Sequence, residues 1–310
     1  MCKTISTLGM KREDWLKLRK NGIGGSDAGA VCGLNPYTSP MAVYRDKTTD
    51  VLDLSDNEAM RQGRDLEEYV AQRFTEETGM KVRRSNKMYW SEAYPFMYAD
   101  VDRLIVGEDA GLECKTVSAY NADKWKDGAI PMHYLVQCVH YMIVTGKRVW
   151  YIAAVILGQG FVYSRIEWDE EFVNQLIVLE ADFWNNHVLS GQMPDPDGSE
   201  SCSAVLGEYF HKARKEDAVA LTSDIEEKLN RRQSLSEEIK RLEKEKSQIE
   251  QEVKVFMDGH EEAGSEHYRV IWQEITSERL DTKRLKQEQP ELYREYMRSN
   301  RSSRFTVKVA

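Results

Sequence analysis

The sequence lacks any long apolar run. Within its 310 residues no stretch approaches the length of about 18 consecutive apolar residues that a membrane-spanning helix requires. The beginning of the sequence also lacks the basic-then-apolar pattern of a secretory leader. We therefore expect a soluble, cytoplasmic protein that has no membrane partner.

Cysteine is sparse and scattered. No CxxC pair occurs, and no cysteine and histidine have the spacing of zinc ligands. We expect reduced thiols, mostly buried, at the five positions Cys2, Cys32, Cys114, Cys138 and Cys202.

An excess of basic charge is also missing. Lys and Arg number 43 against 52 Asp and Glu, so the formal net charge is −9. This balance argues against a passive nucleic-acid coat, because such proteins usually carry a basic excess. It does not exclude a metal-dependent nuclease, because a site that gathers carboxylates lowers the formal count while a bound cation reverses the local field.

Helix and strand signals alternate over the first two thirds of the chain. Trp15 and Leu18 predict a short helix that stops at Gly22, and Ser26 is placed to cap the next one. Apolar spacing predicts later helices over 57–78, 131–145 and 169–189, and a further helix begins at Ser39 and Pro40. Strands are expected over 80–90, 96–106, 111–118, 148–157 and 161–168. The fold class is therefore α/β (α+β), with a central mixed sheet flanked by helices.

The character of the sequence changes after the Pro- and Gly-rich stretch "SGQMPDPDGSES", which predicts a loop. A heptad seam follows, with Lys246 interrupting one position, at Leu235, Ile239, Leu242, Ile249, Val253 and Phe256. This seam predicts a helical hairpin or a short coiled coil. Two strands flanking a helix are expected beyond it, at 266–281 and 302–309. We therefore place a first domain over 1–212 and a separate C-terminal module with a small β element over 213–310.

Two predicted neighbouring strands carry charged residues at alternating positions. Side chains on a strand repeat every two residues, so Asp100 shares a face with Asp102, and Glu113 shares one with Lys115. If the turn "GEDAG" joins these strands as a hairpin, Asp102 meets Glu113 and Lys115. Converging carboxylates beside a cation suit metal-dependent phosphodiester hydrolysis. Ordinary solvated hairpins carry the same pattern, but the site is favoured here by the apolar neighbours Tyr98, Val101, Leu104 and Leu112.

The segment "VDRLIVGEDAGLECK" resembles the PD-(D/E)xK nucleases, the restriction-endonuclease-like superfamily. Three further blocks, "WLKLRKNGIGGSDAGAVCGLNPYTSP", "GRDLEEYVAQRF" and "YLVQCVHYMIVTG", resemble in the same order the YqaJ-type viral recombinase family, relatives of phage lambda exonuclease. The four blocks span roughly residues 15 to 150. The resemblance implies a restriction-endonuclease-like core in a nuclease domain over 1–212. It also implies Mg²⁺ as cofactor, with Mn²⁺ able to substitute.

The resemblance implies a metal site. Asp102 and Glu113 would bind the metal, with the backbone carbonyl of Cys114 as a further ligand, and Lys115 would orient the attacking water. Glu67 matches the family's acidic helix position and would complete the metal or water shell. Without the family, Glu67 is an ordinary glutamate of a charge-rich helix. Family members often have Asp-Gly at the first ligand, whereas here Arg103 follows Asp102, which could alter the turn or place a cation near the DNA.

Two further positions follow from the same resemblance. Gln137 would lie over the site, and it begins the string "QCVHY", which has the QxxxY form of RecB-like nucleases. Otherwise Gln137 is a boundary residue and Tyr141 belongs to the core. Arg19 and Ser26 have the family's spacing for a 5′-phosphate site, in which a guanidinium fork and a helix start bind phosphate oxygens. The alternative is that Ser26 only caps its helix.

The favoured function is a 5′–3′ exonuclease on linear double-stranded DNA that leaves 3′ single-stranded tails for phage-type recombination by strand annealing. The implied partners are double-stranded DNA ends, a single-strand annealing protein and further copies of this chain in a ring-like trimer. The implied setting is the cytoplasm of a bacterial host, with the protein host- or prophage-encoded. Two alternatives stay open: a RecB-like single-strand nuclease or endonuclease, and a non-catalytic DNA-binding assembly protein that works through its heptad seam.

Overall fold

The computed structural model describes residues 2–54, 56–210, 218–298 and 304–308. The chain divides into two compact units, Met1–His211 and Lys212–Ala310, which are described separately. None of the helices in the described ranges combines the length and the apolar character that a membrane crossing demands.

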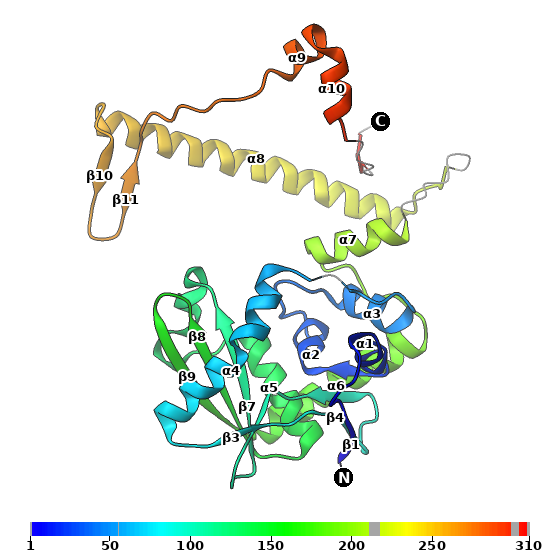
Figure 1. Cartoon of the computed structure of the whole chain (residues 1–310). Helices are drawn as coiled ribbons and strands as arrows, with labels where there is room; N and C mark the ends of the chain where they lie inside the picture. The colour runs from blue at the N-terminus through cyan, green and yellow to red at the C-terminus, as the bar shows by residue number, and fades with distance from the viewer. Residues whose placement is uncertain (1, 55, 211–217, 299–303, 309–310) are drawn as a thin grey trace. The chain divides into compact units, whose positions relative to one another are not determined.

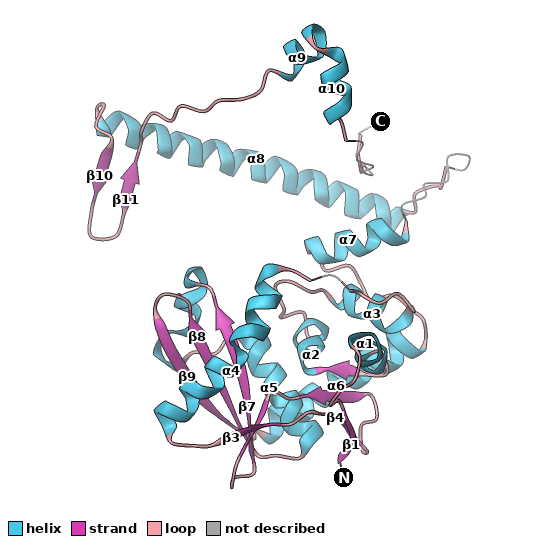
Figure 2. Cartoon of the chain, viewed as in Figure 1, coloured by secondary structure: helices cyan, strands magenta, loops and turns pink. Residues whose placement is uncertain are grey.

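A five-stranded mixed sheet forms the centre of the first unit (Figure 2). Its order is β3 (Val82–Arg84), β6 (Arg103–Ile105), β7 (Ala110–Val117), β8 (Val149–Ile156) and β9 (Gly160–Glu167). Strands β7 and β8 are parallel, and the other neighbours are antiparallel. Strand β8 is almost wholly apolar because it lies between two strands and is buried along nearly all its length. The hairpin of β8 and β9 confirms the prediction.

A second mixed sheet contains β1 (Cys2–Ser6), β4 (Lys87–Ser91), β5 (Met97–Asp100) and β2 (Ile23–Gly24), in that order. The single strand predicted over 96–106 is therefore wrong. It is divided between β5 in this sheet and β6 in the other, with Val101 and Asp102 between them. The strand predicted over 80–90 is divided in the same way. The break in 80–90 falls on the polar residues Ser85 and Asn86, where Asn86 has a φ of 50°. No such signal marks the break at Val101 and Asp102, because the choice of partner strand there is a tertiary matter that local pattern does not encode.

The helices of the first unit are α1 (Arg12–Arg19), α2 (Gly25–Val31), α3 (Pro40–Thr48), α4 (Glu58–Thr78), α5 (Met132–Thr145), α6 (Glu170–Phe183) and α7 (Glu200–Tyr209). A 3₁₀ segment, η1 (Ala119–Gly128), precedes α5, and a π-helical turn, η2 (Trp184–Leu189), continues α6. Helix α7 follows the predicted loop and was not anticipated.

Both ends of α4 follow the capping signals in the sequence, whereas the start of α2 does not. The Asn57 side chain accepts from the Met60 N–H, and Gly79 ends α4 with a φ of 73°. The predicted role of Ser26 as a helix cap is wrong, because the cap position of α2 is Gly24. There the Asp27 carboxylate accepts from the Gly24 N–H at 2.9 Å. Ser26 therefore does not cap α2.

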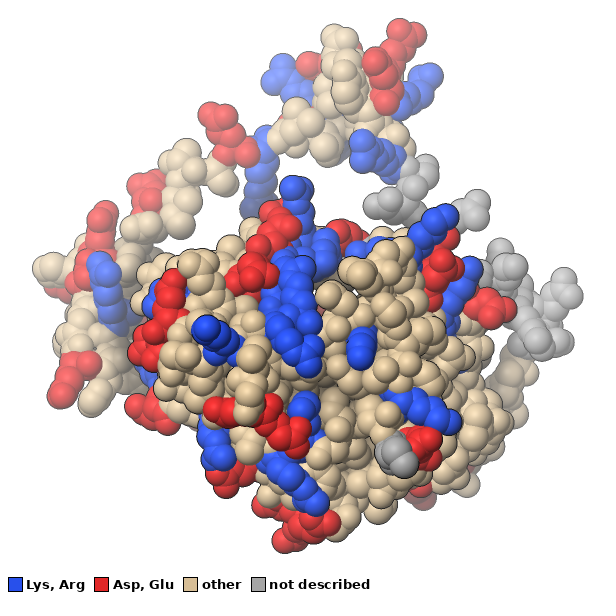
Figure 3. Space-filling view, turned by 60° about the horizontal axis from the view of Figure 1, so that its bottom comes forward, with Lys and Arg blue, Asp and Glu red and all other residues tan. Residues whose placement is uncertain are grey.

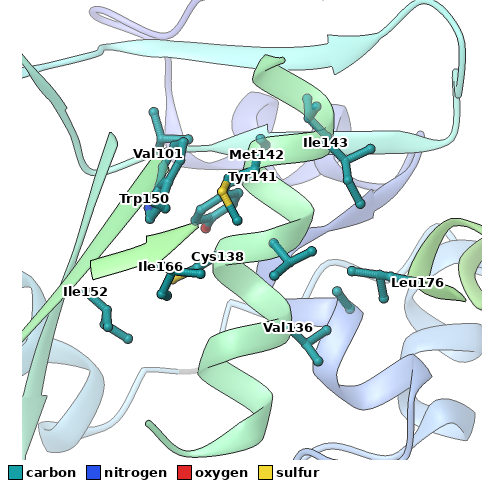
Figure 4. Close-up of a cluster of buried hydrophobic side chains, with 14 of the residues drawn as sticks. Val101, Val136, Cys138, Tyr141, Met142, Ile143, Trp150, Ile152, Ile166 and Leu176 are labelled. Atoms are coloured by element: carbon teal, nitrogen blue, oxygen red, sulfur yellow. The ribbon is translucent and has the colours of Figure 1, made fainter. Parts of the chain in front are cut away.

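Helix α5 lies in the centre of the main apolar cluster, with Tyr141 beside Trp150 and Val101 (Figure 4). Helix α2 approaches α5 closely because glycines face it. A Cβ at Gly25 would lie 2.3 Å from the Tyr141 ring, and one at Gly29 would lie 2.9 Å from the His133 Cβ. This close approach holds the beginning of α2 beside α5.

A buried ion pair also anchors α5. The ring nitrogens of His140 lie 2.8 Å from a Glu180 carboxylate oxygen and 2.8 Å from the Tyr98 carbonyl, and neither ionisable side chain is exposed. Burial opposes protonation of His140, but the Glu180 charge outweighs it and raises the pKa of His140. The pair therefore ties α5 to α6 and β5.

The second unit contains one continuous helix, α8 (Ser223–Met257), of 35 residues (Figure 1). It replaces the predicted helical hairpin. The expected small β element is a hairpin of β10 (Glu262–Gly264) and β11 (Arg269–Ile271), followed by α9 (Thr282–Glu288) and α10 (Pro290–Tyr296). A terminal strand over 302–309 is not formed by residues 304–308, and the remainder of that stretch lies outside the described residues.

Candidate active site

Asp102, just before β6, meets Glu113 on β7, the middle strand of the central sheet. The register pairs Arg103 with Leu112, which places Asp102 beside Glu113, and Asp102 accepts from the Cys114 N–H at 2.8 Å. Burial is the largest cause that raises the pKa of Asp102 well above its usual range, and the negative charges of Glu113 and Glu67 add to it. A cation bound here would relieve that repulsion.

Glu113 lies in a buried polar network. One of its carboxylate oxygens accepts from Lys115 Nζ at 2.6 Å and from Gln137 Nε2 at 2.8 Å. Lys115 also donates to Gln137 Oε1 at 3.0 Å, and Gln137 Nε2 donates to the Tyr141 hydroxyl at 2.9 Å. Burial alone would lower the pKa of Lys115, but Glu113 and Asp102 outweigh it and raise the pKa. Lys115 is therefore a fixed cation, and Tyr141 is both a core residue and a network member.

The other carboxylate oxygen of Glu113, Oε2, is buried and has no hydrogen-bond partner. Buried polar atoms are nearly always paired, so this one indicates a missing ligand. In the described parts of the chain, no three His, Cys, Asp or Glu side chains are grouped to hold a metal ion. Two carboxylates and a backbone carbonyl nevertheless form a hard-oxygen donor set that suits Mg²⁺. The Cys114 carbonyl fits, because the N–H and C=O of one strand residue face the same neighbour.

Arg103 is buried rather than turned toward a DNA surface. Its side chain is 2% exposed and forms an ion pair with Glu67 on α4. It also donates to the Asp102 carbonyl at 2.8 Å and contacts Glu68 at 3.0 Å. Glu67 thus lies close enough to Asp102 to act on its charge but is held by Arg103, and its role as a metal ligand stays a prediction.

The predicted phosphate-binding residues also meet. Arg19 donates to the Ser26 hydroxyl at 2.8 Å and contacts the Asp27 carboxylate at 3.4 Å. The Arg19 guanidinium lies 5.0 Å from the centre of the Trp15 ring, whose Nε1 donates to Asp100 at 2.7 Å. Sequence reasoning missed this use of Trp15 and Asp100. The signal available was the four-residue spacing of Trp15 and Arg19 on one helix.

Asp27 holds Arg19 in place. Burial would raise the pKa of Asp27, but Lys47 and Arg19 lower it to about 2. Lys47 is wholly buried and lies 2.7 Å from the Asp27 carboxylate. No signal in the sequence indicated this pair, because Lys47 reaches Asp27 from a different helix.

One cavity of about 210 Å³ joins the two groups of residues. Its polar lining includes Arg19, Ser26, Asp100, Asp102, Glu113 and Gln137. Figure 3 shows one face of the molecule on which basic and acidic side chains are interspersed among uncharged ones. Because the net charge is −9, attraction for a polyanion must come from local cation sites such as Arg19 and Lys115.

Comparison with known sequences places residues 14–148 in a match to the YqaJ-like viral recombinase domain. The chain is 38% identical over 302 residues to the "Uncharacterized protein YqaJ" of Bacillus subtilis (strain 168), which covers 96% of this chain and 95% of that relative.

Two solved structures share the fold. The alkaline exonuclease LHK-Exo of Laribacter hongkongensis superposes with a TM-score of 0.50 at 20% identity, over 58% of this chain and 94% of that one. LHK-Exo in complex with dAMP gives a TM-score of 0.50 at 19% identity, over 65% of this chain and 100% of that one. At these identities the likeness is one of fold, and it confirms the predicted fold class.

Proposed function

Because the chain belongs to the YqaJ-like viral recombinase family, we propose that it is a Mg²⁺-dependent DNA exonuclease in which Mn²⁺ can substitute. The observation that carries the proposal is the shared cavity: Asp102 and Glu113, with its unpartnered Oε2, line the same hollow as Arg19 and Ser26. The fold likeness to an alkaline exonuclease, and the complex of that protein with dAMP, favour a deoxynucleotide substrate.

Asp102, Glu113 and the Cys114 carbonyl would hold the cation, with Glu67 as a further ligand once Arg103 releases it. When bound, Mg²⁺ supplies Lewis acidity toward phosphate oxygens and lowers the pKa of water. Lys115 is fixed by Glu113 and Gln137, so its ammonium can orient the attacking water and stabilise the negative charge that develops on the phosphate.

Arg19 and Ser26 would bind the terminal 5′ phosphate of a linear duplex. The cavity continues from them to Asp102 and Glu113, so a strand anchored at its 5′ end would present a nearby phosphodiester to the carboxylates. This arrangement gives 5′–3′ digestion and leaves 3′ single-stranded tails for a single-strand annealing protein. A ring-like trimer and a nuclease domain over 1–212 belong to the same proposal.

One observation favours a second candidate. The hydrogen bond between Gln137 and Tyr141 joins the two residues of the QxxxY string, which is typical of RecB-like nucleases. A RecB-like enzyme would cut single strands, or cut internally, without a requirement for a phosphorylated end.

The test is digestion of three substrates: linear duplex with 5′-phosphate ends, linear duplex with 5′-hydroxyl ends, and circular duplex. With Mg²⁺ we expect fastest digestion of the phosphorylated linear DNA and an intact circle, because only the former can occupy the Arg19 and Ser26 site. EDTA should stop all digestion. A cut circle would favour the endonuclease, and no digestion of any substrate would favour a non-catalytic assembly protein.

A further inference from the structure

A second cavity, of about 760 Å³, lies beside the carboxylate site and shares Lys115 with it. Its walls come from the end of β7, from the start of α5, from η1, from the loop before α3 and from the start of α4. The charged residues among those lining it are Lys115 and Lys124, and no Asp or Glu lines it among the described residues. In a chain with 52 acidic residues, such a wall suits an anionic ligand.

Unpaired polar atoms gather at this cavity. Four buried side-chain polar atoms without a hydrogen-bond partner are found among the described residues, and Thr116 Oγ1 and His133 Nε2 are two of them. Both residues line the cavity, and a third such atom belongs to the neighbouring Glu113. Two of these four atoms therefore belong to residues of the cavity wall, so the wall carries polar groups that the protein itself leaves unpaired.

The wall also offers aromatic surface. Tyr37 lines the cavity with its side chain 69% exposed. Lys115 Nζ lies 4.6 Å from the centre of the Tyr134 ring, and the His133 ring is centred 4.0 Å from that of Tyr134. Exposed aromatic rings that alternate with cations are the chemistry with which proteins hold single nucleic-acid strands, through base stacking and phosphate contacts.

We propose that this cavity, the strand groove, holds a segment of single DNA strand next to the scissile phosphate, with a base on Tyr37 and a backbone phosphate on Lys124. The location relative to the scissile phosphate rests on the proposed function. The binding itself does not, because it needs neither the metal nor cleavage.

The test measures fluorescence anisotropy of a labelled single-stranded oligodeoxynucleotide with the full chain in EDTA, which prevents digestion. Tyr37→Ala should weaken binding roughly five- to 150-fold, as loss of one stacked base does. Lys124→Ala should flatten the slope of log affinity against log salt by about 0.7, the value for one single-strand phosphate contact. Tyr120→Ala is the matched control, because Tyr120 lies in η1, is 93% exposed and is not part of the groove wall.

Unchanged affinity in both groove variants, or an equal loss in Tyr120→Ala, would overturn the strand groove. The two proposals fail separately. Tyr37-dependent binding without any Mg²⁺-dependent digestion would leave the groove standing and reject the exonuclease. Mg²⁺-dependent digestion by a protein whose affinity for the single strand is unchanged in Tyr37→Ala and Lys124→Ala would reject the groove and leave the exonuclease standing.

Helix α8 carries an apolar seam along one side. The seam consists of Leu235, Ile239, Leu242, Ile249, Val253 and Phe256. These residues recur at heptad spacing along one side of the helix, and all of them except the half-buried Val253 are 40% to 83% exposed. Heptad seams of this kind are buried against another helix in a coiled coil.

Glutamates border the seam on both sides. In heptad terms, every position that flanks it between residues 238 and 252 is acidic, at Glu238, Glu243, Glu245, Glu250 and Glu252. Apart from Lys246 in the seam itself, the basic residues of this stretch lie on the outer face, at Lys240, Arg241 and Lys244. The surface that would meet a second helix is therefore apolar with acidic edges.

These edges oppose pairing with a second copy of the chain. In a parallel pair, Glu238 would face Glu243 and Glu245 would face Glu250 of the other copy, and an antiparallel pair would also set glutamate against glutamate. We infer that the seam instead docks an amphipathic helix of a different protein, one with Lys or Arg beside its own seam and an acidic residue opposite Lys246. The charge pattern thus selects a basic partner helix.

Two synthetic helical peptides with the same apolar seam test this, one with Lys and one with Glu at all flanking positions. The full chain should bind the Lys peptide in calorimetry, and Leu242→Asp should abolish that binding without a change in nuclease rate. Replacing the five flanking glutamates with Lys should reverse the preference, by about tenfold or more from several charge pairs. Lys244→Glu, on the outer face, is the control and should leave the preference unchanged.

Equal binding of both peptides, or binding of neither, would overturn the inference. So would a change in the molar mass of the protein alone, measured by light scattering, on Leu242→Asp, since that outcome assigns the seam to a second copy.

Discussion

Asp102→Asn and Glu113→Gln should each lower Mg²⁺-dependent digestion of linear duplex by about a hundred- to a thousandfold, the equivalent of several kcal/mol of lost metal assistance. Both substitutions keep the acceptor oxygens that bind Cys114, Lys115 and Gln137. The protein should therefore stay folded. The thermal stability of Asp102→Asn should hold or rise, because the change removes one of two mutually repelling buried carboxylates. Glu113→Gln should lower it, because Lys115 loses its closest counter-ion.

A second readout does not depend on activity. Mg²⁺ or Mn²⁺ should raise the Tm of the wild type by mass action, and the rise should be lost in both variants. Asp109→Asn is the control, because Asp109 lies in the turn between β6 and β7 with its side chain 77% exposed. Near wild-type digestion in either ligand variant, or an unchanged Tm response, would reject the assignment of the metal site.

Arg19→Ala should slow digestion of 5′-phosphorylated duplex by about 10- to 150-fold, the equivalent of roughly 1.5–3 kcal/mol for a charge-assisted hydrogen bond. Digestion of 5′-hydroxyl duplex should change much less, because that end offers no terminal phosphate to the guanidinium. The two substrates should then be digested at nearly equal rates, which single-turnover assays on matched DNA can measure.

Lys17→Ala controls for the loss of one positive charge, since Lys17 is exposed on the same helix. If Arg19→Ala slows both ends by the same factor, Arg19 is a general backbone contact or a structural residue. End recognition would then be withdrawn, and the metal site would be unaffected.

The part of the candidate site that lies on one hairpin was predictable. Glu113 and Lys115 share a face because strand side chains alternate, and the turn before β7 brings Asp102 beside them. Arg19 and Ser26 lie only seven residues apart, and their contact at 2.8 Å agrees with the predicted pairing. In each case the residues are close in sequence, so local geometry was sufficient.

Contacts between distant elements were not predictable. Trp15 donates a hydrogen bond to Asp100. Lys47 forms an ion pair with Asp27, and Arg103 forms one with Glu67. Each contact joins a different pair of elements. A charged residue on a helix or strand has the same local pattern whether it faces water or a buried partner. The buried position of Arg103 beside Glu67 was not predicted for this reason.

The sequence by itself determined the helix ends at Asn57 and Gly79, the apolar strand β8, the heptad seam and the spacing of the carboxylates, because each depends on residues a few positions apart. Only the tertiary structure decided that the stretch 96–106 is divided between two sheets and that Ser26 faces Arg19 instead of capping α2. The physical reason is that strand pairing, burial of charge and helix approach are set by which surfaces meet. The free energy of packing between distant surfaces outweighs local propensity, and no short segment of the sequence determines that packing by itself.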